Sequence, residues 1–188
     1  MERALAFLLL VILAGCSAPA KETVRAPVTE PRIAARSIPY SPPPRPPARL
    51  LADYLIIDKS ERILIAYKDG QPIRAYRGLN FGDAPAGHKQ FEGDERTPEG
   101  LYFIDTRNPR SSYHLSLRIS YPNLSDRAFA AQYGRSAGGD IFIHGQPTGY
   151  RGPELQGDWT DGCIALTNEE IEELWSIVPD GTPIEIRP

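Results

Sequence analysis

The chain has 188 residues and a formal net charge of -3, from 21 lysine and arginine residues against 24 aspartate and glutamate residues. A chain of this length has room for one ordinary globular domain. A net charge so close to zero argues against nucleic-acid binding, which needs a strongly basic face. The two cysteines, Cys16 and Cys163, are too few for a disulfide framework, and no CxxC pair indicates a cysteine-rich zinc module.

The first residues predict an export signal. Arg3 precedes an apolar run over residues 4–13, which leads through small residues to Cys16. A charged start, a short apolar run and small residues at a cleavage point are typical of a secretory signal, and the run is well short of the ~20 residues that cross a bilayer as a helix. Residues 13–16, with the sequence LAGC, resemble a bacterial lipobox. We therefore predict that residues 1–15 are a lipoprotein signal peptide and that Cys16 is lipidated; the alternative is an ordinary signal peptide that happens to contain a cysteine.

Residues 16–52 are predicted to be the lipidated cysteine followed by a flexible tether. Nine of the 19 prolines fall between residues 17 and 52, where six basic residues face two acidic ones. Such a segment has too little apolar surface to pack and is expected to be extended. Ser17 follows the cysteine in place of an acidic residue, which favours the outer membrane in bacteria with two membranes. We expect a protein anchored by lipid to a membrane of the bacterial periplasm.

Residues 53–188 carry 14 basic and 21 acidic residues and are expected to form one mostly β domain. Short apolar runs with β-branched and aromatic content predict strands. The predicted strands span residues 54–58, 63–67, 72–76, 101–104, 113–119, 140–144 and 182–186. A helix is predicted after Thr167, because Thr167 and Glu170 match a capping box and apolar residues follow at helical spacing. We expect a mixed β sandwich or barrel-like fold with one or two short helices.

The residues suited to chemistry gather between His144 and Cys163. A cysteine thiol attacks carbonyls well once a neighbouring imidazole has taken its proton. Gly145 and Gly162 lack a Cβ atom and can bring backbone N–H groups close to an oxyanion. These residues predict a nucleophile, Cys163, and a base, His144. The alternatives are an inert buried cysteine and a zinc site of His144, Cys163 and Asp161, for which the regular ligand spacing is missing.

The predicted export strengthens the case for a reactive thiol. In an oxidising exterior, a free thiol is a liability unless it is used. With Cys16 lipidated, Cys163 has no partner for an intramolecular disulfide. An unpaired cysteine in a secreted protein indicates a reactive group.

The same region resembles the active-site motif of the L,D-transpeptidase catalytic domain family (YkuD type). The matching residues are 144–147, with the sequence HGQP, and 160–168, with the sequence TDGCIALTN. Residues 97–100 and 115–123 also match, so the resemblance covers about residues 53–187. It implies the L,D-transpeptidase catalytic fold, a cysteine transpeptidase that acts on peptidoglycan stem peptides, and inhibition by carbapenem-type β-lactams, with no cofactor or metal.

Two residues depart from the family motif. Asp161 stands where the common motif has a second histidine, which leaves His144 as the only credible base and Asp161 as an electrostatic or orienting group. Ala165 stands where many members carry an arginine, so a charge that could hold a substrate carboxylate is missing. Similar variants occur in a subgroup of the family whose enzymes attach lipoproteins to the wall or release them.

The resemblance implies a mechanism in which Cys163 attacks the L-centre carbonyl of diaminopimelate in a tetrapeptide stem. Backbone N–H groups around Gly162 and Cys163 would stabilise the oxyanion, and the Gly145 carbonyl, or another acceptor, would orient His144. An amine would resolve the thioester into a 3-3 cross-link or a lipoprotein attachment. Water would make the enzyme a carboxypeptidase or endopeptidase instead, and a non-catalytic wall-binding lipoprotein is the third interpretation.

The remaining aromatic and histidine residues are assigned by position. Tyr150, Trp159 and Thr160 are candidates for the wall of the substrate groove, and anchoring of the loop is the alternative for the two aromatic residues. His88 and His114 are interpreted as bystanders. We expect a monomer whose partners are a donor stem peptide, an amine acceptor and, through the lipid, a membrane.

Overall fold

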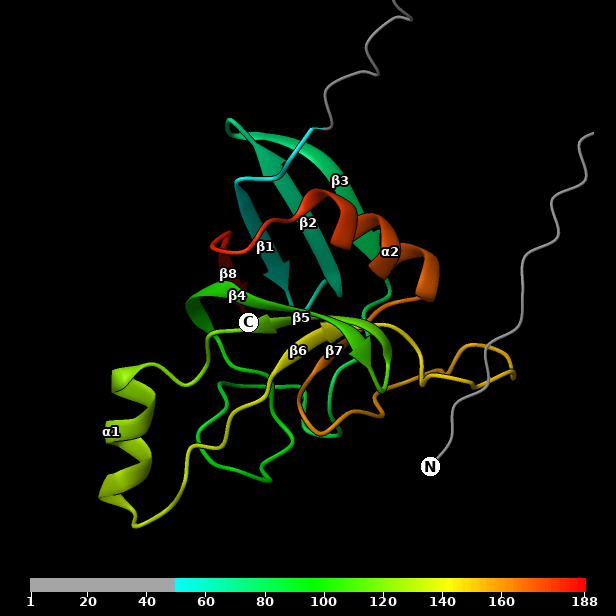
Figure 1. Ribbon diagram of the computed structural model, residues 1–188. Helices are drawn as coiled ribbons and strands as arrows, with labels where there is room; N and C mark the ends of the chain where they lie inside the picture. Colours follow the sequence, from blue (N-terminus) through cyan, green and yellow to red (C-terminus); the bar gives the residue numbers. More distant parts are fainter. Residues whose placement is uncertain (1–49) are drawn as a thin grey trace, which may run out of the picture. The chain divides into compact units, whose positions relative to one another are not determined.

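The computed structural model describes residues 50–188, so the predicted signal, Cys16 and residues 17–49 of the predicted tether lie outside the described residues. In chain order, the elements are β1 (Tyr54–Asp58), β2 (Ile63–Lys68), β3 (Gln71–Arg77), β4 (Gly100–Ser111), β5 (His114–Ile119), α1 (Leu124–Gln132), β6 (Phe142–His144), β7 (Ile164–Ala165), α2 (Asn168–Ile177) and β8 (Pro183–Arg187) (Figure 1). Neither helix of this part is long and apolar enough to cross a membrane.

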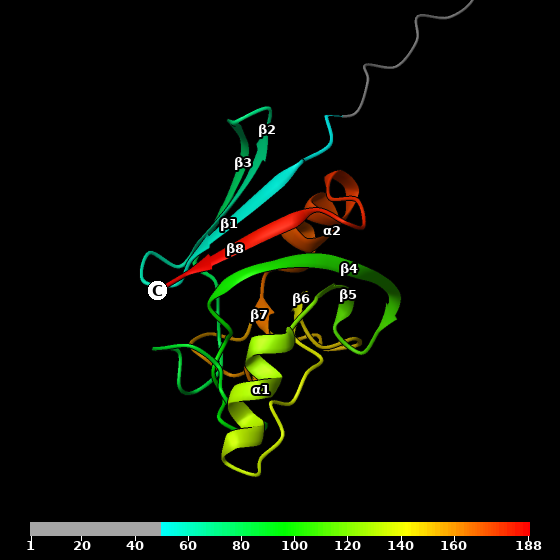
Figure 2. The ribbon, with the colours of Figure 1, turned by 90° about the vertical axis from the view of Figure 1, so that its left-hand side faces the viewer.

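The strands form one bent sheet in the order β3-β2-β1-β8-β4-β5-β6-β7. β4 joins the two halves of this sheet, because its first residues pair with β8 and the rest of it pairs with β5. Figure 2 shows β4 arching between the upper strands and β5. Most neighbours are antiparallel, but β1 with β8 and β6 with β7 are parallel. The prediction of a mostly β fold with one or two short helices is confirmed, and the described residues contain two helices.

The main core lies where the sheet packs against α2, which contacts β5 and β6. Every second residue along several strands is fully buried, because successive side chains of a strand point to opposite faces of the sheet. The largest fully buried side chains are Phe81, Leu55, Ile57, Leu64, Leu79, Ile104, Leu117, Ile119, Ile143, Ile164, Ile171 and Leu174. The predicted capping box of α2 is present, because Thr167 Oγ1 accepts the Glu170 N–H and Glu170 Oε2 accepts the Thr167 N–H, both at 3.1 Å.

The sequence does not predict α1, although a capping box also begins this helix. Asn123 Oδ1 accepts the Asp126 N–H at 3.1 Å, and Asp126 Oδ2 accepts the Asn123 N–H at 2.8 Å. Only Asp126 and Ala130 of the helix are buried. The helix therefore lacks the apolar stripe from which amphipathic helices are predicted, and it lies apart from the strands in Figure 1.

Several predicted boundaries differ from the structure, most of them by one residue, and three of the differences have a structural reason or consequence. β6 begins at Phe142 and not at residue 140, because Asp140 has a positive φ of 54° and bends the chain out of the strand. β4 continues beyond residue 104 to Ser111, and most of the residues in this extension are exposed. Ala52, placed in the predicted tether, is buried and donates its N–H to Ile177 O at 2.8 Å, so the folded part includes it.

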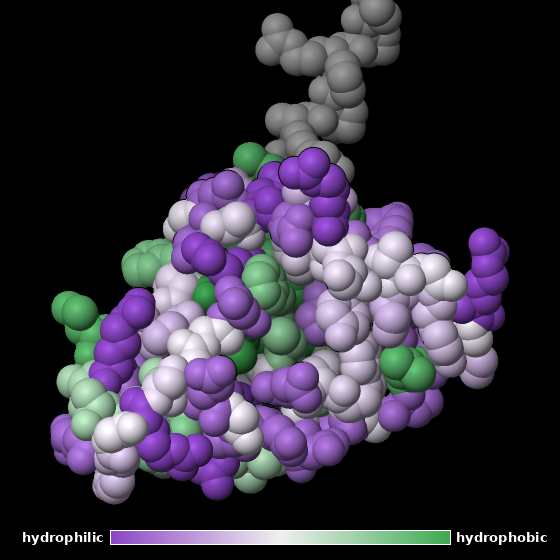
Figure 3. All heavy atoms as spheres, turned by 60° about the horizontal axis from the view of Figure 1, so that its bottom comes forward, coloured by the Kyte–Doolittle hydropathy of each residue, from purple (hydrophilic) through white to green (hydrophobic). Residues whose placement is uncertain are grey.

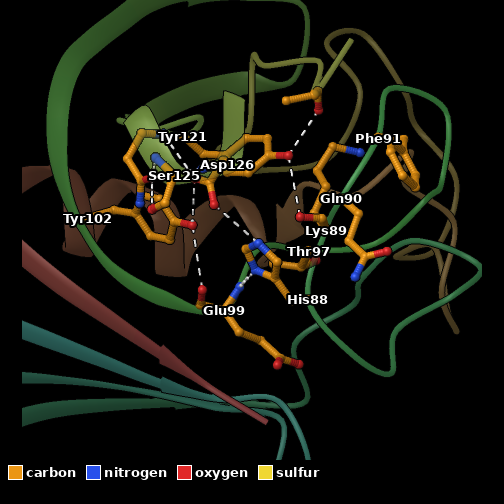
Figure 4. A network of polar contacts seen from close by, with 12 residues as sticks. His88, Lys89, Gln90, Phe91, Thr97, Glu99, Tyr102, Tyr121, Ser125 and Asp126 are labelled. Carbon is orange, nitrogen blue, oxygen red and sulfur yellow. Dashed lines mark hydrogen bonds and ion pairs between the residues drawn. The ribbon is translucent and has the colours of Figure 1, made fainter. Parts of the chain in front are cut away.

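A buried polar network joins α1 to the loop before β4 (Figure 4). Asp126 Oδ2 accepts the Tyr102 hydroxyl at 3.0 Å, and its Oδ1 lies 3.2 Å from His88 Nε2. His88 Nδ1 accepts the Glu99 N–H at 2.9 Å, so the hydrogen of the neutral ring is on Nε2 and points to Asp126. Through this loop the network supports Thr97, whose hydroxyl donates to Gly162 O at 2.9 Å, next to Cys163.

Candidate active site

Cys163 and His144 line the same cavity, which has a volume of about 390 Å³. His144 is the last residue of β6, and Cys163 immediately precedes β7. The parallel pairing of these strands sets His144 opposite Ala165, and this pairing brings the two predicted catalytic residues to one site. The other residues lining the cavity are Asn108, Ser111, Ser112, Tyr113, Ser116, Gly139, Asp140, Ile141, Phe142, Trp159, Thr160 and Asp161. The face of the molecule drawn in Figure 3 is mostly hydrophilic, with apolar residues visible between the polar ones.

His144 has the hydrogen bonding of a general base. Its Nδ1 lies 2.7 Å from Gly145 O, the acceptor that the sequence predicts. A carbonyl oxygen can only accept, so Nδ1 carries the hydrogen and Nε2 of the neutral ring is unprotonated. Burial lowers the pKa of His144, and the hydrogen bond to Gly145 O opposes this only in part. His144 is therefore neutral at neutral pH and able to accept a proton at Nε2.

Cys163 is a protonated thiol in this resting arrangement. Burial raises the pKa of Cys163, and the Phe142 N–H, which donates to Sγ at 3.4 Å, acts in the opposite direction. The thiol itself donates to Asp140 O at 3.6 Å. Among residues 50–188, no hydrogen bond joins Sγ to His144. Activation therefore requires the S–H group to turn from Asp140 O toward the imidazole.

The turn before Cys163 is held by Thr160. The Thr160 hydroxyl donates to Cys163 O at 2.8 Å and accepts the Gly162 N–H at 3.2 Å. The Gly162 N–H is thus occupied, in contrast to the predicted role in binding an oxyanion. The Cys163 N–H makes no hydrogen bond to another described residue, so it remains available as a donor to an oxyanion. Thr160 lines the cavity as predicted, but its hydroxyl serves the turn.

Glycine is required at position 162 by its surroundings. The φ of Gly162 is +115°, and a Cβ atom there would lie 2.5 Å from Arg96 O. Side chains rarely adopt such a φ, and the carbonyl could not move freely, because it belongs to the loop that the Thr97 hydroxyl ties to Gly162 O. Glycine at position 162 therefore allows the turn before Cys163 to lie close against the backbone of Arg96 and Thr97.

Two aromatic rings flank the imidazole of His144. The Tyr113 ring lies 4.6 Å from the His144 ring between centroids, and the Trp159 ring lies 5.6 Å from it, edge to face. Trp159 thus lines the cavity as predicted. Tyr113, in the turn between β4 and β5, is a site residue that the sequence does not predict. Tyr150 does not line the cavity, and its hydroxyl lies against Gly152 instead.

Asp161 and Gly145 have surroundings that limit their predicted roles. Asp161 is exposed at the rim of the cavity, and its negative charge raises the pKa of Cys163, so it opposes the thiolate. His144 Nδ1 is oriented by Gly145 O and not by Asp161. The Gly145 N–H donates to Tyr113 O at 3.1 Å, and a Cβ atom at Gly145 would lie 2.6 Å from Asn168 Oδ1. Gly145 therefore positions the base and does not bind the oxyanion.

The other histidines lie outside the cavity. His114 Nε2 lies 2.7 Å from Glu172 Oε1 on the surface, and His88 belongs to the network with Asp126. Within residues 50–188, no group of three or more histidine, cysteine, aspartate or glutamate side chains is placed to hold a metal ion.

Comparison with known proteins agrees with this geometry. Residues 52–186 match the model of the YkuD family, the L,D-transpeptidase catalytic domain. The chain belongs to this family. An Escherichia coli K12 protein named "Putative L,D-transpeptidase YafK" is 30% identical over 131 residues, which are 66% of this chain and 46% of that protein.

Solved structures of this family have the same fold. The helical cell shape determining protein Pgp2 from Campylobacter jejuni is 28% identical, with a TM-score of 0.54 over 73% of this chain and 50% of that chain. The Ldtfm–avibactam carbamoyl enzyme is 17% identical, with a TM-score of 0.50 over 74% of this chain and 50% of that one, and this likeness concerns the fold alone. The chain spans about half the length of these relatives.

Ala165 of this L,D-transpeptidase domain stands where many family members carry an arginine, and no cation that lines the cavity within residues 50–188 takes the place of that arginine. Ala165 is buried, with 1% of its surface exposed, and its N–H donates to Asn80 O at 2.9 Å. No lysine or arginine is among the described residues that line the cavity. In the part of the chain that the structure describes, the cavity therefore holds no side-chain cation in place of the arginine that position 165 lacks.

Proposed function

We propose that this protein is a cysteine L,D-transpeptidase that acts on peptidoglycan stem peptides. The observation that carries the proposal is that Cys163 and His144 line one cavity in the fold of this family. The Gly145 carbonyl holds Nδ1 of His144, which leaves Nε2 as the acceptor for the thiol proton. A packed structural cysteine would not need such a partner.

The proposed reaction begins with proton transfer from Cys163 Sγ to His144 Nε2. Sγ then attacks the L-centre carbonyl of diaminopimelate, and the Cys163 N–H donates to the oxyanion. When the intermediate collapses, the carbon–nitrogen bond breaks, and the imidazolium of His144 protonates the departing amine of D-alanine. An acyl thioester on Cys163 remains.

The second half of the reaction releases the acyl group. An acceptor amine attacks the thioester carbonyl, His144 takes its proton, and the thiolate of Cys163 leaves and is reprotonated. The new amide is a 3-3 cross-link when the acceptor is another stem peptide, and a lipoprotein attachment when the acceptor is a lipoprotein side chain.

A cysteine carboxypeptidase or endopeptidase is the second candidate function. Polar side chains, among them Asn108, Ser112 and Ser116, line the cavity around the thiol, so water can reach the thioester. Hydrolysis by the same two residues would trim wall peptides or release a wall-bound lipoprotein.

A mass measurement after treatment with a carbapenem tests the nucleophile. We expect one covalent adduct on the wild type and none on Cys163→Ala. No adduct on the wild type, or an adduct that survives Cys163→Ala, would contradict the proposal and favour a non-catalytic wall-binding protein. Analysis of the products from a purified tetrapeptide stem, with and without an amine acceptor, separates transfer from hydrolysis.

We propose further that Cys16 is lipidated and anchors the protein in the periplasm, at the outer membrane. This proposal is supported by the resemblance of residues 13–16 to a lipobox and by Ser17. Labelling of cells with a radioactive fatty acid should mark the wild type and not Cys16→Ala, and the label should separate with outer-membrane fractions. A wild type without label would overturn the anchor and leave the proposed activity untouched.

A further inference from the structure

The peptide group between Gly162 and Cys163 is held by a side chain from a distant part of the chain. Its carbonyl oxygen, Gly162 O, accepts the Thr97 hydroxyl at 2.9 Å, and Thr97 is fully buried. Its N–H belongs to Cys163 and makes no hydrogen bond to another described residue, and the proposed reaction uses this N–H as the donor to the oxyanion. Thr97 therefore holds one end of the group whose other end meets the oxyanion.

The geometry of the peptide bond links Thr97 to the direction of that N–H. A trans peptide group is planar, so its C=O and its N–H point in opposite directions and turn together. A hydrogen bond that fixes the carbonyl of Gly162 thus fixes the Cys163 N–H as well. Gly162 has no Cβ atom and a φ of +115°, so its own backbone sets few steric limits on the orientation of the peptide group that follows it. The restraint on this group comes from Thr97.

Thr160 does not duplicate this restraint. Its hydroxyl accepts the Gly162 N–H and donates to Cys163 O, and these atoms belong to the peptide groups before and after the one that Thr97 holds. Within residues 50–188, no second hydrogen bond reaches Gly162 O. The two threonines therefore have separate roles in one turn, and only Thr97 acts on the group that carries the Cys163 N–H.

Lys59, in the turn after β1, holds the backbone of Thr97. Its ammonium group donates to Gly87 O and to Glu99 Oε1, both at 2.7 Å, and to Thr97 O at 3.4 Å. An ammonium group has three N–H donors, so all three are used, and the side chain is only 4% exposed. The Lys59 N–H donates to Arg187 O of β8 at 3.1 Å. A buried cation thus fastens the backbone of Thr97 to the sheet.

We propose that Thr97 is a positioning residue that sets the oxyanion site, and that Lys59 supports it. The Thr97 hydroxyl holds the Gly162–Cys163 peptide group in the orientation that directs the Cys163 N–H to the oxyanion. Neither Thr97 nor Lys59 lines the cavity, so both act through the backbone and without contact with the substrate. This inference rests on the proposed function, in which the oxyanion forms when Sγ attacks a carbonyl.

Two reagents for the Cys163 thiol separate this role from a merely structural one. A carbapenem is attacked at a carbonyl carbon and forms an oxyanion, whereas iodoacetamide is attacked at a saturated carbon, loses iodide and forms none. Thr97→Val removes the hydroxyl and keeps the shape of the side chain. We expect it to slow acylation by the carbapenem about 10–100-fold, which is part of the ~10²–10³-fold that one oxyanion donor contributes. The rate of alkylation by iodoacetamide should not change.

Conservative and matched variants complete the experiment, and mass spectrometry of the peptide that contains Cys163 measures both rates. Thr97→Ser keeps the hydroxyl and should restore acylation. Thr182→Val also removes a buried hydroxyl, one that donates to Pro179 O at 2.8 Å, and should leave both rates at the wild-type value. Lys59→Met should slow acylation about tenfold without changing alkylation, because Thr97 loses its support. If Lys59→Met does not fold, the Thr97 variants decide the proposal.

Equal acylation rates in Thr97→Val and the wild type would overturn the inference. So would a parallel loss of acylation and alkylation, because that would indicate a displaced thiol and not a misdirected N–H group, and so would a failure of Thr97→Ser to recover. A wild type that forms no carbapenem adduct would overturn the proposed function and this inference together. An adduct that forms equally fast on the wild type and Thr97→Val would leave the proposed function standing while the inference fails.

Discussion

The two halves of the bent sheet differ in the length of their outermost strands. The half with β1, β2, β3 and β8 consists of strands of five to seven residues, with fully buried side chains such as Leu64. In the half that carries the site, β6 and β7 have three and two residues, and loops are tied by side chains such as Thr97 and Thr160. Both halves bury apolar side chains, Ile143 and Ile164 among those of the second, but in the second half individual hydrogen bonds also set the geometry of the loops.

One ion pair connects the two halves. Arg62, next to β2, donates from both terminal nitrogens to Asp158 at 2.7 Å, and Asp158 Oδ1 also accepts the Phe81 N–H at 2.9 Å. Phe81 is fully buried, and its carbonyl accepts the Trp159 and Thr160 N–H groups, both at 3.0 Å. The segment that leads to Cys163 belongs to the half that carries the site. These hydrogen bonds attach it to the half with β1, β2, β3 and β8.

The largest effect is expected in the half that carries the site, from His144→Gln. Glutamine cannot take the thiol proton, so the rate of acylation by a carbapenem should fall by about 10²–10⁴-fold. Time-resolved mass spectrometry of the adduct measures this rate. His114→Gln is the control, because His114 pairs with Glu172 outside the cavity, and it should acylate at the wild-type rate. A loss smaller than tenfold in His144→Gln would remove His144 from the role of base.

In the apolar half, Leu64→Ala should reduce stability and leave the chemistry intact. Leu64 is fully buried, so its truncation should lower the free energy of unfolding by about 2–5 kcal/mol. Urea denaturation followed by fluorescence measures this change. The acylation rate per folded molecule should equal that of the wild type, and a parallel fall would show that the two halves are not separable.

Thr160→Val and Thr182→Val compare the same chemical change in the two halves. Each removes a buried hydroxyl that donates to a backbone carbonyl at 2.8 Å, Cys163 O for Thr160 and Pro179 O for Thr182. Both should cost about 1–3 kcal/mol of stability. Only Thr160→Val should slow acylation, by about tenfold, because the turn also sets the position of Sγ. Equal rates in the two variants would contradict the assignment of Thr160 as a positioning residue.

The smallest expected effect is on the pH dependence of acylation. Burial lowers the pKa of His144, so its neutral, proton-accepting form persists as pH falls below the ordinary histidine range. The midpoint of the acid decline in rate should therefore lie below pH 6.5. Because burial raises the pKa of Cys163, direct ionisation of the thiol should increase the rate only above its ordinary range. An acid decline centred at or above pH 6.5 would contradict this description of the site.

Much of the regular structure is predictable from local patterns. The alternation of apolar residues predicts β1, β2 and β5 to within a residue, and the Thr167 capping box predicts the first residue of α2. Such signals lie within a few neighbouring residues, because period and capping are properties of one element. α1 escapes prediction since its capping box precedes a helix with almost no buried face.

The site is predictable only in part. The spacing of His144 and Cys163 and the resemblance of their surroundings indicate the pair, and the structure places Gly145 O 2.7 Å from His144 Nδ1. The choice of Tyr113 over Tyr150 as the ring beside His144 depends on the register between β5 and β6. Sequence proximity favours Tyr150, but pairing across the sheet brings the β4–β5 turn to the imidazole.

The sequence by itself determines the charge and cysteine distribution, the mostly β class, the capping of α2 and the residues suited to nucleophilic chemistry. Only the tertiary structure decides that the Gly162 N–H is occupied by Thr160 and that the Gly162 carbonyl is held by Thr97. Periodicity and capping depend on residues that are neighbours along the chain, so the sequence alone predicts them. Hydrogen bonds between distant segments depend on strand register, which the packing of the whole sheet settles.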